Sequence, residues 1–113
     1  MKQATPQLYD GMYVLSAHLS DDARTKAFEK LREKITSRGG EIKKIHDQGR
    51  RRLAYEINRH REGYYYLMYF TLSPDCINEL WQEYHHNEDL IRFVTLRTDK
   101  VLNEIKFKSL VEQ

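Results

Sequence analysis

The chain has 113 residues, of which 40% are apolar, and a formal charge of +2, which together fit one domain around one core. A single cysteine, Cys76, excludes an internal disulfide, and no apolar stretch reaches the roughly 20 residues that a membrane-spanning helix needs. Because the amino terminus also lacks the apolar core of a signal peptide, we expect a protein of the reducing cytoplasm.

The first expected elements are a strand and a helix. Residues 8–15 carry apolar side chains on both faces of the strand, which favours an interior position in a sheet. Ser20, followed by two aspartates, is typical of a helix start, and we expect this helix to end at Gly39-Gly40. Its apolar stripe consists of Ala27 or Phe28, Leu31 and Ile35.

A pair of strands should follow. Residues 52–57 alternate strictly between polar and apolar, and we expect one long strand over residues 41–57 with a bulge or bend near Gly49. A polar connection over residues 58–63 then leads into an aromatic strand over residues 64–72. The two strands are predicted to form a hairpin.

The last elements are a second helix and a fourth strand. Ser73 offers an N-cap and Pro74 a first helical residue, and the helix should end near His86-Asn87. Its apolar stripe would be Ile77, Leu80, Trp81 and Tyr84. Residues 90–97 are expected to form the last strand.

The order β-α-β-β-α-β predicts an α+β, ferredoxin-like split sandwich, a four-stranded antiparallel sheet with two helices on one face. We assign residues 1–98 to this single RNA- and protein-binding domain. Residues 99–113 are expected to form a C-terminal tail that is loosely ordered or bound to a partner.

The aromatic strand over residues 64–72 should present two different faces. Its even-numbered residues are the more apolar set and should meet the helices. Tyr65, Leu67 and Tyr69 would then lie exposed on the helix-free face. Because exposed aromatic residues are enriched in binding patches, these three are the candidate partner-binding residues.

Positive charge is concentrated in the middle of the chain. Residues 43–61 hold seven lysines and arginines against two acids, a net charge of +5, so the remainder carries −3. Guanidinium groups fork onto phosphate oxygens, which makes Arg50, Arg51 and Arg52 the first candidates for RNA binding. The second rank consists of Lys43, Lys44, Arg59 and Arg61. The competing interpretation for all of them is a solvated charge run, in which Arg61 could pair with Glu62.

The aromatic strand also suggests a different mode of RNA binding, in which bases stack on exposed rings. Residues 62–69 match five of the seven specified positions of the third-strand motif of RNA-recognition modules. Glu62 stands where the motif needs a cation, and Tyr65 where it needs a small residue. The stacking aromatics would be Tyr64 and Tyr66, which the polarity pattern turns toward the helices.

The sequence does not support a catalytic site or a metal site. The five histidines lack zinc-ligand spacing, and Cys76 has no evident catalytic partner. The connection over residues 16–20 contains neither glycine nor lysine or arginine with which to bind a phosphoryl group. We therefore expect a protein that is not an enzyme and has no cofactor, metal or small-molecule substrate.

Four separated segments carry a specific resemblance. They are Tyr-Asp-Gly-Met-Tyr-Val-Leu at residues 9–15, the arginine-to-strand segment at 49–58, His-Arg-Glu-Gly-Tyr-Tyr at 60–65 and Asn-Glu-Asp-Leu-Ile-Arg-Phe at 87–93. In order and spacing, the chain resembles the bacterial small-subunit ribosomal protein S6 family over about residues 8–98.

The resemblance implies the same fold and a structural, noncatalytic role in the small subunit of the cytoplasmic ribosome. It further implies binding to the central domain of the small-subunit ribosomal RNA together with ribosomal protein S18, as a heterodimer and mainly through backbone phosphates. The phosphate-contact role would belong to Arg50, Arg51 and Arg52. Alternation along the strand sends Arg51 and Arg52 to opposite faces, which leaves open which arginine reaches a phosphate.

Overall fold

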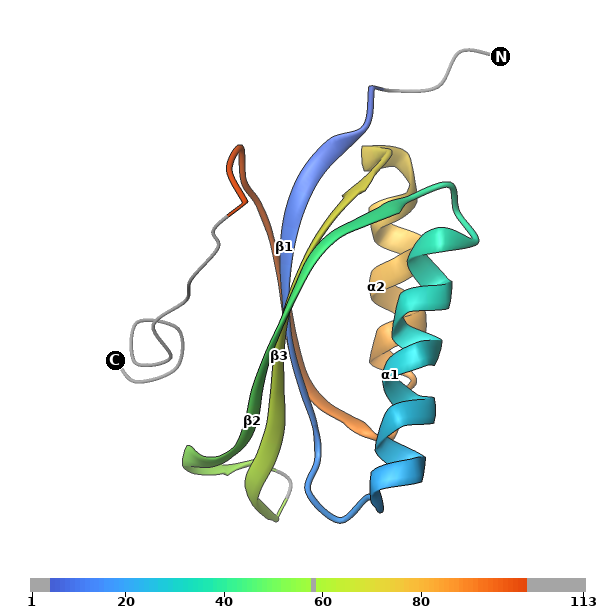
Figure 1. Cartoon of the computed structure of the whole chain (residues 1–113). Coiled ribbons are helices and arrows are strands. Elements are labelled where there is room, and N and C mark those ends of the chain that lie inside the picture. The colour runs from blue at the N-terminus through green and yellow to red at the C-terminus, as the bar shows by residue number, and fades with distance from the viewer. Residues whose placement is uncertain (1–4, 58, 102–113) are drawn as a thin grey trace.

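The computed structural model describes residues 5–57 and 59–101 (Figure 1). Its elements are β1 (Gln7–Ser16), α1 (Asp21–Thr36), β2 (Glu41–Ile57), β3 (His60–Leu72), the 3-10 helix η1 (Pro74–Cys76), α2 (Ile77–His85) and β4 (Leu90–Arg97). The strands form an antiparallel sheet in the order β2-β3-β1-β4, and both helices cover one face. The predicted α+β fold is confirmed. Most of the predicted tail lies outside the described residues, which end at residue 101.

Helix α1 follows its sequence signals closely. The Ser20 hydroxyl accepts a hydrogen bond of 3.1 Å from the backbone N–H of Ala23, which satisfies one of the free donors of the first turn. The buried stripe consists of Ala27, Leu31 and Ile35. The helix ends at Thr36, three residues before the predicted end at Gly39.

Helix α2 begins later than its sequence predicts. The N–H of Cys76 donates to the Ser73 carbonyl, a 3-10 bond that tightens the first turn, and the Ser73 side chain makes no capping bond. The regular helix therefore starts at Ile77. Trp81, expected in the apolar stripe, is 50% exposed and stacks on His85. Among the described residues, neither helix is long and apolar enough to cross a membrane.

The main core lies between the sheet and the helices. Tyr13 of β1 is fully buried and meets the ring of Tyr84 edge to face, with ring centroids 5.3 Å apart. Within residues 64–72 of β3, the even-numbered residues face the helices, as predicted. They are Tyr64, at the margin of the core, and the buried residues Tyr66, Met68, Phe70 and Leu72.

The β2–β3 hairpin is tighter than expected. Ile57 pairs with His60, so β3 begins inside the stretch that was predicted to be a polar connection. Polar residues can continue a strand where one side of it faces solvent, and polarity alone therefore misplaced this boundary. The single long strand β2 and its irregularity next to Gly49 are confirmed.

A second, smaller cluster packs on the helix-free face. Leu53 of β2 lies against Val14 and Tyr65, and Ile57 packs against the same group. The register between β2 and β3 shifts between Arg52 and Ile57. This end of β2 consequently covers part of the face that the helices leave free.

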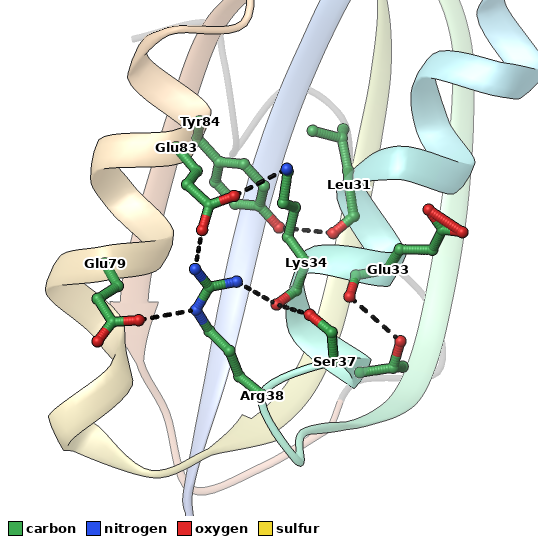
Figure 2. A network of polar contacts seen from close by, with 9 residues as sticks. Leu31, Glu33, Lys34, Ser37, Arg38, Glu79, Glu83 and Tyr84 are labelled. Carbon is green, nitrogen blue, oxygen red and sulfur yellow. Dashed lines mark hydrogen bonds and ion pairs between the residues drawn. The ribbon is translucent and has the colours of Figure 1, made fainter.

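Polar contacts join the two helices on their outer side (Figure 2). The guanidinium of Arg38, which follows α1, pairs with both Glu79 and Glu83 of α2. Lys34 pairs with Glu83 at 2.8 Å, and Arg38 also donates to the Lys34 carbonyl. These contacts fix the end of α1 against α2, away from the basic hairpin.

Candidate nucleic-acid interface

The three-arginine run lies in β2 directly after a bend at Gly49. Gly49 has a φ of +77°, a conformation that glycine adopts without strain, and its N–H donates to a carboxylate oxygen of Asp47 at 2.9 Å. The register with β3 shifts between these two residues. The bulge therefore sets the direction in which the arginines leave the sheet.

Register assigns each arginine to a face. Arg50 lies opposite Tyr64 and Arg51 opposite Gly63 in the pairing of β2 with β3. Directly opposed residues project to the same side of an antiparallel sheet, and Tyr64 borders the helix-side core. Arg50 and Arg52 are thus on the helix side of the hairpin and Arg51 on the helix-free side, so Arg51 and Arg52 lie on opposite faces, as alternation predicts.

The three arginines also differ in their partners. The Nε of Arg50 lies 2.5 Å from Oε1 of Glu62, and this hydrogen bond raises the pKa of Arg50. The Nε of Arg51 donates to the Gln48 carbonyl at 3.0 Å. Arg52 is exposed, and its side chain makes no hydrogen bond or ion pair with residues 5–57 or 59–101. Of the run, Arg52 is the most available for an external anion.

Of the second-rank candidates, the two lysines lie apart from the arginine run. Lys43 pairs with Glu41 at 2.9 Å, near the start of β2. Lys44 lies opposite Tyr69 and so projects to the helix-free side. Six residues of strand separate Lys44 from Arg50, roughly 20 Å. The structure does not bring these lysines to the arginines.

The two second-rank arginines do join the run. Arg59 and Arg61 line, with Arg50, a cavity of about 240 Å³ at the tip of the hairpin. Arg61 pairs loosely with Glu56, its Nε lying 3.7 Å from Oε2, whereas Glu62 binds Arg50. The local pairing of Arg61 with Glu62, which the sequence left open, is not formed among the described residues.

Sequence reasoning missed the contribution of the β1–α1 connection to this cavity. Ala17 and His18 complete its lining, and the ring of His18 lies 5.2 Å from that of His60. The sequence of this loop, with no lysine or arginine, gave no sign of an anion site. The signal is non-local, since the hairpin brings its own arginines to the loop.

Nearby, a further cation reaches the hairpin from α1. The guanidinium carbon of Arg24 lies 4.0 Å from the centre of the Tyr64 ring, a cation–π contact. Tyr66 faces the helices, is 7% exposed and stacks on Phe28 at 4.3 Å. Arg24 occupies one face of the Tyr64 ring, and Tyr66 is buried against Phe28, which argues against the base-stacking mode.

The candidate partner residues Tyr65, Leu67 and Tyr69 lie on the helix-free side, as predicted, but they are not exposed. Their exposed fractions are 5%, 3% and 2%. Leu53 packs on Tyr65, and the ring of His46 meets that of Tyr69 at 6.0 Å. The expectation of exposure is wrong for all three residues, and side chains of β2 contact two of them, Tyr65 and Tyr69.

Other residues form the accessible part of this face. Tyr55 of β2 is 62% exposed and Leu96 of β4 is 58% exposed. Nη1 of Arg92 donates to the Tyr55 hydroxyl at 3.1 Å, which links β2 to β4 across the small cluster. Asp10 of β1 lies opposite Leu96, and partial burial raises the pKa of its carboxyl group.

Comparison with known proteins gives a consistent result. A family model described as Ribosomal protein S6 matches residues 8–97. The small ribosomal subunit protein bS6 of Protochlamydia amoebophila (strain UWE25) is 66% identical over 113 residues, covering 100% of this chain and 99% of that protein. The small ribosomal subunit protein bS6 of Chlamydia abortus (strain DSM 27085 / S26/3) is 61% identical over 112 residues, covering 99% and 100%.

The fold comparison agrees with the sequence matches. The crystal structure of 30S ribosomal protein S6 from Thermotoga maritima is similar with a TM-score of 0.79 at 28% identity, covering 83% of this chain and 89% of that one. With the four-stranded sheet and the basic hairpin, these matches identify the chain as a member of the ribosomal protein S6 family, whose members are structural, non-enzymatic proteins of the small ribosomal subunit.

Proposed function

We propose that the chain binds the central domain of the small-subunit ribosomal RNA together with ribosomal protein S18, mainly through contacts to backbone phosphates. The observation that carries the proposal is the exposed arginine run on a paired strand. A paired strand holds guanidinium groups at fixed spacing, and such contacts position a protein on RNA without reading its sequence.

Within the run, we assign the leading phosphate contacts to Arg52 and Arg51. Arg52 is exposed and makes no side-chain hydrogen bond or ion pair within the described part of the chain. Arg51 is exposed, and a backbone carbonyl orients its guanidinium. The two lie on opposite sides of the hairpin, so an RNA strand crossing the edge of β2 could contact both.

The partner protein is proposed to cover the helix-free face. This face exposes the apolar side chain of Leu96 beside the carboxylate of Asp10, which has no ion pair among the described residues. A partner with an apolar residue and a cation at this position would complement both groups. Tyr65, Leu67 and Tyr69 would then support the interface from beneath and not contact the partner through exposed rings.

The RNA proposal is tested by the salt dependence of binding. Replacing both Arg51 and Arg52 with Gln should weaken binding and flatten the salt slope by roughly 0.7 to 0.9 per lost phosphate contact. The matched control replaces Lys26 and Lys30, two exposed cations of α1, and removes the same charge. An equal change of slope in both double variants would refute specific contact by the arginine run.

The partner proposal is tested with purified S18. Leu96→Asp should weaken the complex in calorimetry, because it places a second carboxylate beside Asp10 and removes an apolar contact. Trp81→Asp on α2 is the control, since Trp81 is similarly exposed on the opposite side of the molecule. If only the Trp81 variant lost affinity, the partner would bind the helices.

A further inference from the structure

We infer that the cavity at the hairpin tip binds one phosphate group of the RNA backbone, and that Glu62 competes with this phosphate for Arg50. The inference rests on the proposed RNA-binding function and assigns a place for one contact within it. It also gives a role to Glu62, the only acid that lines the cavity among the described residues.

The composition of the cavity favours an anion. The residues that line it include three arginines and one glutamate, a formal excess of two positive charges. The arginines are Arg50 from β2, Arg59 from the hairpin turn and Arg61 from the start of β3, so that separate backbone segments converge on one space. An excess of positive charge around one space attracts an anion, and a phosphate can accept hydrogen bonds from more than one guanidinium group.

The Arg50–Glu62 pair can be exchanged for a phosphate. Both side chains are about half exposed, at 55% and 44%, and a pair this accessible to water contributes little to stability. A carboxylate and a phosphodiester each present two oxygens to the fork of a guanidinium. Glu62 therefore orients Arg50 in the free protein and leaves it when a phosphate enters.

The other two arginines, Arg59 and Arg61, are held by weaker contacts or by none among the described residues. Arg61 is 81% exposed, and its contact with Glu56 is 3.7 Å long. Arg59, which has a φ of +69°, makes no ion pair within the described residues. Both can turn toward an anion without breaking a short contact.

The first experiment measures the affinity of the full chain for a central-domain RNA fragment, with S18 present throughout. Glu62→Gln should tighten binding by about three- to tenfold and steepen the salt slope, because a competing carboxylate is removed. Glu41→Gln is the matched control, since Glu41 forms an ion pair with Lys43 within β2, and neither residue lines the cavity. Weaker binding by the Glu62 variant, or an equal gain in the control, would overturn the competition.

A second set of variants tests the cavity itself. Arg59→Gln with Arg61→Gln should weaken RNA binding, and the gain from Glu62→Gln should disappear in an Arg50→Gln background. If these changes have no effect while the Arg51 and Arg52 variants lose binding, the cavity assignment fails and the proposed function stands. If no arginine variant changes RNA binding, the proposed function itself fails.

A titration with inorganic phosphate distinguishes a site for the RNA backbone from a site for free phosphate. Titration of the free protein, followed through the NMR signals of the His18 ring, should give no saturation below millimolar phosphate, because one isolated anion lacks the adjoining contacts of an RNA strand. Saturation at micromolar phosphate would identify a site for a free anion and overturn the assignment to RNA.

Discussion

The hydroxyl group of Tyr84 on α2 donates a 2.9 Å hydrogen bond to the backbone carbonyl of Leu31 on α1 (Figure 2). Tyr84 is 1% exposed, and the acceptor lies within a helix. The hydroxyl thus has a defined partner inside the core and ties the two helices together beneath the outer ion pairs. Burial raises its pKa strongly, so the group stays protonated as a donor.

Tyr84→Phe should lower the free energy of unfolding by about 1 to 2 kcal/mol, since the buried hydrogen bond is lost while the ring remains. Urea denaturation measures this effect. Tyr55→Phe is the control, because the Tyr55 hydroxyl bonds to Arg92 at the exposed surface and its removal should cost less than about 0.5 kcal/mol. Equal losses of unfolding free energy in the two variants would show that the buried hydrogen bond stabilises the fold no more than the exposed one.

The ion pairs between the helices predict a graded response. Arg38 has a side chain that is 17% exposed and two acidic partners, whereas the Arg32–Glu29 pair lies within one helix, with 41% and 55% exposure. Arg38→Met should cost about 1 to 2 kcal/mol of stability and Arg32→Met less than about 0.5 kcal/mol. Thermal melts of both variants test the order, and a reversed order would contradict the network.

Much of the fold could be predicted from local sequence patterns. The cap at Ser20 and the alternation after Gly49 depend on residues close together in the chain, and the structure places both elements as expected. Polarity and capping preferences failed at two boundaries, the starts of β3 and α2. At these points hydrogen bonds decide the conformation, through the pairing of Ile57 with His60 and the 3-10 bond from Cys76 to Ser73.

The site was less predictable, for non-local reasons. The arginine run was visible in the sequence, and alternation placed Arg51 and Arg52 on opposite faces, but only the register with β3 shows which face each occupies. The burial of Tyr65 involves Leu53, which lies 12 residues earlier in the chain and packs on it from the neighbouring strand β2. The cavity likewise depends on His18, which the β1–α1 connection brings beside His60 of the hairpin. Neither relationship leaves a periodic pattern in the sequence.

The raised pKa of Asp10 predicts a dependence of stability on pH. Desolvation raises the pKa of the folded state above the ordinary value of 3.8, so the folded state binds a proton more readily than the unfolded chain. The stabilising contribution of this bound proton is complete below pH 3.8 and is lost as the pH rises through the folded-state pKa of Asp10. The ionised carboxylate therefore destabilises the isolated protein at pH 7.

Asp10→Asn should accordingly raise the free energy of unfolding at pH 7 in urea titrations, and the difference from the original chain should narrow at pH 3. The same change at the exposed Asp99 serves as the control and should have little effect. A variant that was less stable at pH 7 would indicate that the carboxylate makes a favourable contact.

Two glycines of the hairpin should respond differently to alanine. An added Cβ at Gly49 would meet nothing within 4 Å, so Gly49→Ala should cost only the backbone strain of a positive φ, about 1 to 2 kcal/mol. At Gly63 the Cβ would lie 2.4 Å from Cγ1 of Val14 and 3.1 Å from the Leu15 carbonyl oxygen. That change should cost about 2 to 3 kcal/mol through overpacking.

The double variant Gly63→Ala with Val14→Ala separates overpacking from other causes. If the Val14 side chain is the obstacle, the two losses of stability should be clearly less than additive in chemical denaturation. Full additivity would place the clash on the backbone instead. Gly49→Ala with Val14→Ala should remain additive, because Gly49 has no contact with Val14.

Tyr66→Ala distinguishes a core residue from a base-stacking residue. Tyr66 is 7% exposed and stacks on Phe28 at 4.3 Å on the helix side, so its removal should lower stability by about 3 to 5 kcal/mol in a thermal or urea melt. Tyr55→Ala, which truncates an exposed ring, should cost much less. A stacking residue would behave in the opposite way, with roughly 1 to 3 kcal/mol of RNA affinity lost and stability retained. Because the fraction of folded Tyr66 variant is known from the melt, its RNA affinity can be corrected for unfolding, and an unchanged corrected value would exclude base stacking at this position.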